Sequence, residues 1–564
     1  MLPLFCEWLS FLSLFVGDLE PEQVLNLGQI SGGEERTAFK NGERKQRFQW
    51  TVQRIRLSPQ EKHLAWATDE VLFYTTLEGL RCSRVFRLDL TSSRSRITSV
   101  FEETRPDVFV EVVLSRDRQI LSINCNTRTS SEVLLIDTAT PTLEPLLVQP
   151  RQLDLLYHVE HWRRRLIILT NAGPGQEYQV VQAPLSEPSM VSWVSLFAPG
   201  PGTAIKDMDV VGDHCVLTVR TPADELALTV VPLTHPKKAY TLPPWACAIE
   251  TKKPGLAEQR EVLEFLISSP VHPPVPHCLY PEDGLLLSED GSSLENQGNY
   301  TTTRLKACSQ DGTLVPVTLF HAVPEEGLRQ APLLAHVYGA YGRDLHMEFC
   351  PDKRLLLEQG WALAYCHIRG GGERGLSWQR QAREEGKQKG VEDLQACLQH
   401  LFSLGFSSPS LTALTAHSAG AVPVGALCNR HPHMMRAVTL QAPFLDVLGT
   451  MEDPSLPLTL EDREEWGDPI GNPKHRLTIT SYCPLCNITP QRYPSMLLTA
   501  YSSDARVPLA GVLKYTEQLK KAIHTYLTTN PKSGMYTHTH THIHIHSLSL
   551  FLSHSHTINH LFIM

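Results

Sequence analysis

The sequence has no block of basic residues and no cysteine pattern of the kind that builds a disulfide framework. Its net charge is −9, so a nucleic-acid partner is not expected. The 13 cysteines are odd in number and scattered, which is typical of reduced thiols and predicts a cytoplasmic protein. The only C-x-x-C, at residues 483–486, lacks a second pair or a redox-fold context. We therefore expect no metal or redox role for it.

The sequence argues against a cleavable leader at the N-terminus, although its apolar start could suggest one, and against a membrane span. Residues 1–16 are apolar, but Glu7 interrupts them, no Lys or Arg precedes Arg36, and no A-x-A cleavage site follows. The run is too short to cross a bilayer as a helix. We expect residues 1–45 to form a separate N-terminal segment, with a packed helix or an error in the gene model as the alternatives, and no membrane span.

From about residue 50 to residue 267 the pattern is that of many short strands. Short apolar runs, such as residues 71–74 and 215–219, are separated by polar turns, and long helical periodicity is absent. This pattern indicates a sandwich or a propeller over residues 46–300, although the blades cannot be counted from the sequence. The proline-rich residues 269–276 predict an extended connector.

Beyond the connector, strand-like and helix-like segments alternate. Two strands flank the turn Asp311-Gly312, and the alternation continues up to a helix at residues 512–523. This order predicts an α/β domain with a doubly wound parallel sheet over residues 301–523. A chain of 564 residues is longer than one hydrophobic core usually serves, which agrees with two domains.

The α/β domain is organised around residues 411–428. A buried-strand pattern leads into A-H-S-A-G at residues 416–420 and then into an apolar helix face. A nucleophile elbow needs a Ser on a tight strand-to-helix turn, with small residues two before and two after it. Ser418 is therefore the candidate nucleophile, and the Ala419 N–H is the candidate oxyanion donor. The alternative is a serine in an ordinary strand-to-helix turn.

A serine nucleophile also needs a base and an acid that orients the base. In α/β-hydrolases the chain order is Ser, then Asp or Glu, then His. The strand pattern of residues 495–501 runs into a short polar loop that contains Asp504. This position at a strand end predicts Asp504 as the triad acid, and the alternative is an ordinary surface carboxylate.

Several ordered motifs together resemble the prolyl oligopeptidase (S9) family of serine hydrolases, which have the α/β-hydrolase fold. The motifs are D-G-T-L-V-P at 311–316, V-Y-G-A-Y-G at 337–342, R-G-G-G-E at 369–373, the elbow at Ser418, W-G-D-P at 466–469 and D-A-R-V-P at 504–508. The motif at 337–342 and A-P-F-L-D-V-L at 442–448 are most similar to the prolyl endopeptidase-like branch. The resemblance runs from roughly residue 20 to residue 523.

The resemblance implies an enzyme whose propeller covers the mouth of the hydrolase domain. Its substrates would be small peptides, esters or thioesters, cleaved through an acyl-enzyme without a cofactor or metal. It implies that Ser418 is the nucleophile, that Asp504 is the triad acid and that Arg506 contacts substrate carbonyls. The hydroxyl of Tyr341 would join the Ala419 N–H as oxyanion donor, although Tyr338 is close by. The glycines of residues 370–372 are expected to be architectural.

The resemblance leaves two further points open. The acidic residues of 461–465 are similar to the acidic pocket of the basic-specific oligopeptidases, but a solvated helix face is the alternative. The prolyl endopeptidase-like branch is associated with vesicle trafficking at the trans-Golgi. This implies an alternative function, a non-catalytic interaction protein with a trafficking partner and a Golgi association.

The sequence departs from the family in three places. Pro423 is expected to bend the helix after the elbow. The strand-rich region is short for a closed ring, so an incomplete propeller is expected. The family's catalytic His would fall in the Thr-His repeat of residues 537–546, where no glycine lies near, so no catalytic His is assigned.

The low-complexity tail, residues 524–564, contains no recognisable strand or amphipathic helix. We expect it to be disordered, and a translated nucleotide repeat explains it better than a metal-binding His tract. The chain is accordingly expected to be catalytically impaired and marginally folded.

Overall fold

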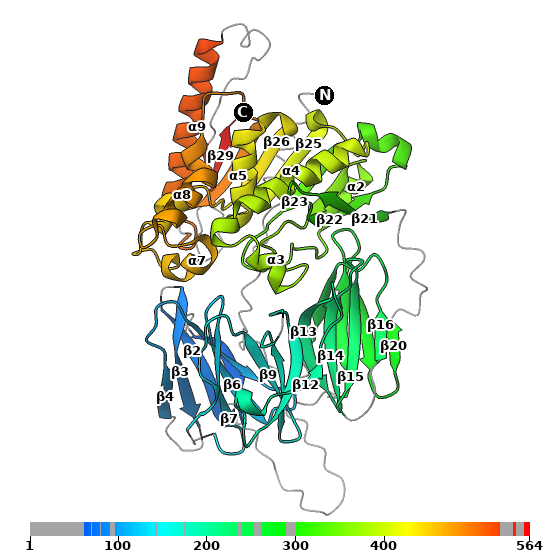
Figure 1. Cartoon of the computed structure of the whole chain (residues 1–564), viewed down its shortest axis with the longest axis vertical. Helices are drawn as coiled ribbons and strands as arrows, with labels where there is room; N and C mark the ends of the chain where they lie inside the picture. The colour runs from blue at the N-terminus through cyan, green and yellow to red at the C-terminus, as the bar shows by residue number, and fades with distance from the viewer. Residues whose placement is uncertain are drawn as a thin grey trace, which may run out of the picture.

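The computed structural model describes residues 61–530, except 69, 79, 91–95, 142–143, 174, 234–237, 253–260, 289–299 and 503, together with two strands at 545–548 and 558–563. The expectations for residues 1–45 lie outside these residues. The described chain forms a domain of small β-sheets and an α/β domain, which lie one above the other (Figure 1).

The first domain contains five four-stranded antiparallel sheets within the described residues. Apolar side chains pack between successive sheets in four shared clusters, and none of the clusters formed by the described residues joins the fifth sheet to the first. The expected propeller-like domain is confirmed, while its incompleteness stays a prediction. Its strands are β1 (Glu61–Trp66), β2 (Val71–Glu78), β3 (Arg81–Asp89), β4 (Arg96–Glu102), β5 (Phe109–Leu114), β6 (Ile120–Asn126), β7 (Ser131–Asp137), β8 (Leu146–Gln149), β9 (Tyr157–Trp162), β10 (Arg165–Thr170), β11 (Gln179–Pro184), β12 (Val194–Phe197), β13 (Ala204–Val211), β14 (His214–Arg220), β15 (Leu226–Pro232), β16 (Lys238–Thr241), β17 (Ala248–Thr251), β18 (Leu263–Ser268), β19 (Val275–Tyr280) and β20 (Leu285–Ser288).

The second domain is built on one sheet with the strand order β21-β22-β24-β23-β25-β26-β27-β29-β28. The five strands from β24 to β27 in this order are parallel. The order reverses between β23 and β25, so the carboxyl ends of these two strands mark the topological switch point where doubly wound sheets bind ligands. In chain order, the first seven strands of this sheet are β21 (Thr301–Cys308), β22 (Leu314–His321), β23 (Leu333–Val337), β24 (Ala362–Cys366), β25 (Thr412–His417), β26 (Ala437–Gln441) and β27 (Ser495–Tyr501).

Helices cover both faces of this sheet. The helices α4 (Gln388–Ser403), α5 (Ala421–Arg430) and α9 (Leu509–Thr529) share one buried cluster with one face. On the opposite face α2 (Pro351–Glu358) packs in a separate cluster. The predicted α/β fold with a doubly wound parallel sheet is therefore confirmed.

The proline-rich stretch is not a connector between domains, which corrects the sequence-based expectation. Residues 269–274 form the turn between β18 and β19, which pair with each other in the fifth sheet. Ser269 and Val271 are fully buried, and the Ser269 hydroxyl is 2.7 Å from the His272 ring. The backbone bends at residues 270–272 and is extended in strand only from Val275, and strand pairing places the stretch inside the propeller.

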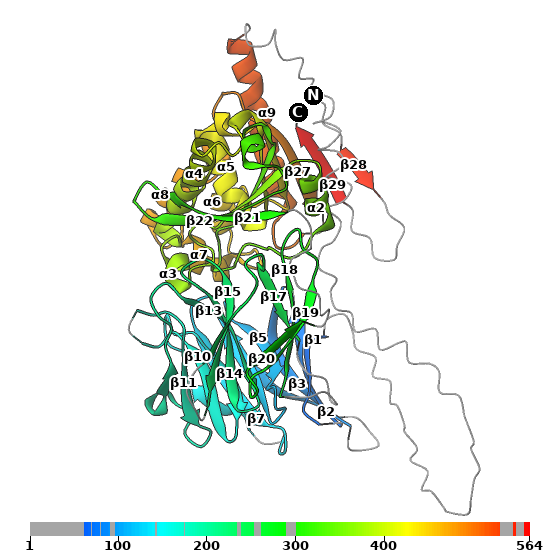
Figure 2. The ribbon, with the colours of Figure 1, turned by 90° about the vertical axis from the view of Figure 1, so that its right-hand side faces the viewer.

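The end of the second domain also differs from the expectation. Helix α9 continues to Thr529 instead of ending at Ile523, because the first residue that breaks a helix is Pro531. Two strands of the tail, β28 (Ile545–Leu548) and β29 (Ile558–Ile563), extend the sheet beside β27 (Figure 2). The expectation of a tail without strands is wrong at these residues, because β27 without β29 would have a free edge that an apolar segment can cover. The remainder of the tail lies outside the described residues.

Two smaller points concern helices. Pro423 is the third residue of α5, within the first turn, where an N–H has no partner inside the same helix, so proline is tolerated there. Across the described residues, every helix is too short or too polar to span a bilayer.

Candidate active site

Ser418 lies on a sharp turn between β25 and α5. Its backbone φ is +49°, a left-handed conformation that is rare for a residue with a side chain. The turn is a short 3-10 segment, Ser418–Gly420, that leads directly into α5. Ala419 is buried, whereas Ser418 is partly exposed at the carboxyl end of β25. This is the geometry of a nucleophile elbow, as the A-H-S-A-G pattern predicts.

The small residue after the elbow serine is required by a close backbone contact. A Cβ on Gly420 would lie 2.8 Å from the Val337 carbonyl oxygen and 3.0 Å from the Tyr338 Cα. Both atoms belong to the backbone and cannot rotate away. Gly420 therefore lets the start of α5 pack directly against the end of β23, at the switch point of the sheet.

Strained backbone is concentrated at this edge of the sheet. Tyr341, Ser418 and Ala442 all have positive φ, at +59°, +49° and +43°, and they follow β23, β25 and β26. Each such residue costs of order 1–3 kcal/mol, and residues of this kind cluster at functional sites. Three consecutive strands thus end in strained turns at the place where the elbow presents Ser418.

Asp504 lies at the same edge, after β27, as predicted. One of its carboxylate oxygens accepts hydrogen bonds from the backbone N–H groups of Arg506 (2.8 Å) and Val507 (3.0 Å). Only β26 separates β25 from β27, and neighbouring strands are about 4.8 Å apart, so the two strand ends are about 10 Å apart. This separation leaves room for an imidazole between Ser418 and Asp504. The Arg506 side chain is exposed at this edge.

The hydroxyl of Tyr341 faces a different set of partners from the one expected of an oxyanion donor. It accepts a hydrogen bond from Trp466 Nε1 (2.9 Å) and donates to Asp462 Oδ2 at 3.4 Å. Burial and the nearby Asp462 carboxylate raise the pKa of Tyr341 well above its usual value. By contrast, the ring of Tyr338 stacks on the ring of His417, next to the nucleophile, with 4.9 Å between centroids. The oxyanion role of Tyr341 stays a prediction that requires its proton to leave Asp462.

The acidic residues of α7 (Thr459–Trp466) are not a solvated helix face. Glu461 and Glu465 are buried, and Asp462 and Glu464 are partly buried. Burial raises the pKa of Glu461 to about 7 and also raises the pKa of Asp462. One oxygen each of Glu461, Glu464 and Glu465 is buried without a hydrogen-bond partner among the described residues. Burial of these carboxylate oxygens without partners costs desolvation free energy, and such a costly arrangement is typical of a functional site.

A cation from the propeller pairs with this cluster. One Arg128 nitrogen, Nη2, is 2.8 Å from Glu461 Oε1 and 2.7 Å from Asp462 Oδ1. Its guanidinium lies over the Tyr341 ring, 4.1 Å from the centroid. A second cation, Lys387 from the start of α4, pairs with Glu465. Sequence reasoning missed Arg128 because its partners are more than 300 residues away along the chain and no local pattern marks it.

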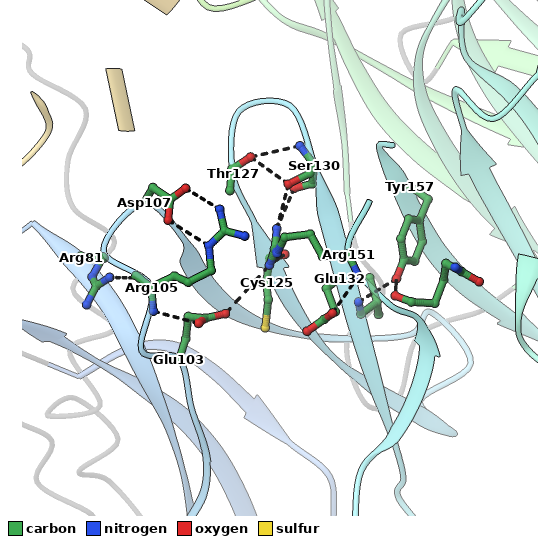
Figure 3. A network of polar contacts seen from close by, with 12 residues as sticks. Arg81, Glu103, Arg105, Asp107, Cys125, Thr127, Ser130, Glu132, Arg151 and Tyr157 are labelled. Atoms are coloured by element: carbon green, nitrogen blue, oxygen red, sulfur yellow. Dashed lines mark hydrogen bonds and ion pairs between the residues drawn. The ribbon is translucent and has the colours of Figure 1, made fainter. Parts of the chain in front are cut away.

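The loop that carries Arg128 is itself held rigidly by Arg151 (Figure 3). Two Arg151 nitrogens donate to the Ser130 carbonyl oxygen (3.1 Å) and to the Cys125 carbonyl oxygen (2.7 Å), on either side of Arg128. The Thr127 and Ser130 hydroxyls are 3.0 Å apart across the same turn. Arg128 is thereby presented to α7 from a fixed turn between β6 and β7.

Other contacts fasten the propeller to the active edge of the hydrolase domain. Asp344, in the loop after β23, pairs with Lys206 at 2.5 Å and with Arg220 at 3.6 Å. The carboxylate of Glu177 accepts the N–H groups of Leu376 (2.8 Å) and Ser377 (2.7 Å). The propeller thus covers the edge where the parallel strands end, on the side of α3 (Leu376–Arg380) and α7 (Figure 1).

The R-G-G-G-E motif supports this edge from within the domain. Arg369 is fully buried and its guanidinium pairs with Asp393 (2.7 Å) and Asp311 (2.5 Å). A Cβ on Gly370 would lie 2.3 Å from the Gly339 carbonyl oxygen. The motif therefore lets two backbone segments touch beside the V-Y-G-A-Y-G turn, which agrees with the architectural role inferred from the sequence.

Among the side chains that the structure describes, no histidine hydrogen-bonds to Ser418 or Asp504, so no third triad member is assigned. In the same residues, no group of three or more His, Cys, Asp or Glu side chains is arranged to hold a metal ion. Among the tail histidines, His560 lies opposite Thr499 in the sheet register, two residues before the end of β27 at Tyr501.

A serine elbow at the switch point of a doubly wound sheet, beneath a propeller, defines a propeller-capped α/β-hydrolase. The profile of the "Prolyl oligopeptidase family" matches residues 348–554, and that of the "Prolyl oligopeptidase, N-terminal beta-propeller domain" matches residues 32–278. The chain belongs to the prolyl oligopeptidase family.

Curated relatives and a solved structure agree with this membership. The chain is 43% identical to "Prolyl endopeptidase-like" of Gallus gallus over 83% of its length and 44% identical to that of Homo sapiens over 82%. It spans 64% of the length of each of these two proteins. The structure of oligopeptidase B from Trypanosoma brucei, a closed form with covalently bound antipain, matches with a TM-score of 0.71 and 27% identity, over 81% of this chain and 66% of that one.

Proposed function

We propose that this chain is a serine-type hydrolase that cleaves small peptide, ester or thioester substrates through an acyl-enzyme on Ser418. The observation that supports this most strongly is the strained elbow, in which a non-glycine residue with φ +49° stands at the carboxyl end of β25, at the switch point. Strain of this kind persists only where surrounding structure enforces it.

The roles of the individual groups follow from their positions. Ser418 Oγ would attack the substrate carbonyl, and the Ala419 N–H at the start of the 3-10 turn would stabilise the oxyanion. Asp504 would orient a histidine placed between β25 and β27. Arg506, exposed at the same edge, would contact backbone carbonyls of the substrate. No cofactor is required by this scheme.

The propeller is proposed to restrict access to this site. The contacts of Arg128, Asp344 and Glu177 fasten it over the active edge, so a substrate must enter around or between the domains. Short peptides and esters should enter, while large folded proteins should be poor substrates. Cleavage of a casein-sized folded protein as fast as a short peptide would contradict this restriction.

We also propose that the chain as written turns over slowly. No histidine side chain that the structure describes hydrogen-bonds to Ser418 or Asp504, and removal of one triad member typically costs a factor of about 10⁴ or more in turnover. The chimera that tests this carries the C-terminal segment of the Homo sapiens relative in place of residues 530–564. The chimera is expected to turn over its substrates faster than this chain does.

The experiment measures turnover of short peptide, ester and thioester substrates by this chain, by the chimera and by the chimera with Ser418→Ala. We expect clear turnover by the chimera alone. Equal turnover by the chimera and its Ser418→Ala variant would remove Ser418 from the mechanism.

A second candidate function is a non-catalytic interaction protein, with a trafficking partner and a Golgi association. The absence of a histidine contact to Ser418 within the described residues favours it. A chimera whose turnover equals that of its Ser418→Ala variant, combined with stable binding of a vesicle protein through the propeller, would support this candidate over the hydrolase.

A further inference from the structure

Two cysteines near the end of α8 (Pro473–Tyr482) lie in thiol-to-thiol contact. The Cys483 side chain is buried and hydrogen-bonded to the thiol of Cys486, which is exposed. Of the twelve cysteines that the structure describes, only Cys486 and Cys308 are exposed. The C-x-x-C therefore combines a protected sulfur with one that solvent reaches.

The backbone around the pair suits a disulfide. Pro484 has φ −56° and ψ −44°, and Leu485 begins a 3-10 segment, so these two residues are the centre of a four-residue turn. The first and last Cα atoms of such a turn lie within about 7 Å. Disulfides need about 4.4–6.8 Å between Cα atoms. Closure of a bond between Cys483 and Cys486 therefore requires little movement of the chain.

The turn is anchored through the backbone of its two middle residues. The Pro484 carbonyl oxygen accepts from Asn429 Nδ2 at 2.8 Å, and the Leu485 N–H donates to the Leu445 carbonyl oxygen at 3.1 Å. The Cys483 thiol adds a long contact of 3.7 Å to the Leu445 carbonyl oxygen. The anchors hold the turn in place whether the thiols are reduced or joined.

Backbone donors also surround the Cys483 sulfur. The N–H groups of Val447, Leu448 and Cys486 point at it, together with the Cys486 thiol. The hydrogen bond from the Cys486 thiol, followed by those from the backbone N–H groups, lowers the pKa of Cys483, and the same thiol–thiol bond raises the pKa of Cys486. The two sulfurs thus share one proton.

We propose that Cys483 and Cys486 are a redox-active dithiol that exchanges with low-molecular-mass disulfides of the glutathione class. Cys486 gives its proton to the Cys483 thiolate as its sulfur attacks the disulfide R–S–S–R, and one R–S⁻ leaves and takes a proton from water. Cys483 then loses its proton and attacks the Cys486 sulfur, which releases the second thiolate. Counted from the thiolate–thiol pair, the two cysteines lose two electrons and one proton, and R–S–S–R becomes one R–SH and one R–S⁻.

The chain contains two matched controls for this reaction. Cys366 and Cys397 are also in thiol contact, but both are buried, and burial raises the pKa of Cys397 well above its usual value. Cys308 is exposed, and its thiol contacts the Ser309 carbonyl oxygen instead of a second thiol. The first pair should therefore resist oxidation, and Cys308 should stop at a mixed disulfide.

The experiment equilibrates the reduced full chain with oxidised and reduced glutathione, quenches with acid, alkylates under denaturing conditions and maps tryptic peptides by mass. Cys483 and Cys486 fall in one peptide, residues 477–492. We expect this peptide to lose both alkylation sites and two hydrogens, reversibly with dithiothreitol. The peptides of Cys366 and Cys397 should stay alkylated. Two alkylated thiols in residues 477–492, at a glutathione ratio where Cys308 has reacted, would overturn the proposal.

Two variants test the order of the steps. In Cys483→Ser, a glutathione adduct should remain trapped on Cys486, because no thiol resolves it. In Cys486→Ser, which changes only an exposed side chain, Cys483 should take up no adduct, because its sulfur is buried. Uptake by Cys483 at the rate of Cys308 would contradict the paired mechanism.

Discussion

The buried carboxylate of Glu461 makes the stability of this chain depend on pH in a way that one substitution removes. Its side chain is 7% exposed and its pKa rises from 4.5 to about 7, mainly through burial, with Arg128 opposing. This rise corresponds to about 3 kcal/mol in favour of the protonated form. Because the folded state binds the proton more tightly, the stabilisation is complete below about pH 4.5 and is lost as the pH rises through about 7. Between about pH 5 and pH 8 the loss should be about 2–3 kcal/mol.

Urea denaturation of the wild type and of Glu461→Gln, at several pH values over this range, measures the effect. The glutamine resembles the protonated glutamate, so the two chains should be equally stable at about pH 5. The variant should be more stable by about 2–3 kcal/mol at about pH 8. Glu187→Gln, at an exposed carboxylate, should follow the wild type. A constant difference in the free energy of unfolding between the wild type and Glu461→Gln over this pH range would contradict the raised pKa of Glu461. So would a wild type that becomes more stable relative to the variant as the pH rises.

Three further predictions follow from other contacts. Gly420→Ala should destabilise by about 1–3 kcal/mol in thermal unfolding, because its Cβ meets backbone at 2.8 Å, whereas Gly200→Ala, with open space around it, should stay within about 0.5 kcal/mol; equal melting temperatures would contradict the close contact. Asp393→Ala should cost about 3–5 kcal/mol in urea, because it leaves the buried Arg369 without its main partner, and a loss under about 1 kcal/mol would show that the pair is dispensable. In the chimera, Asp504→Asn should lower ester turnover by orders of magnitude, with stability within about 1 kcal/mol, and unchanged turnover would remove Asp504 from the triad.

The nucleophile elbow could be predicted from the sequence because its determinants are local. A buried strand, a small-residue turn and an apolar helix face all lie within residues 411–428. The strand at residues 495–501 and the loop of Asp504 are local for the same reason. The structure matches these segments closely, since neither needs information from the other domain.

The interface around Arg128 could not be predicted, because its partners come from another domain. The same limit explains why α7 was open to interpretation as a solvated face: its charges are paired from across the interface. Strand pairing explains two expectations that the structure corrects. It places residues 269–276 inside the fifth sheet and sets β29 against β27, and neither pairing is visible in local composition.

The central claim, that Ser418 is an activated nucleophile, is tested most directly by labelling with a fluorophosphonate and mapping the adduct by mass. The chimera should label at Ser418, its Ser418→Ala variant should not label, and the present chain should label much more slowly. No adduct on Ser418 in the folded chimera would contradict the claim. Labelling of the chain as written at the rate of the chimera would show that a tail histidine acts as the base.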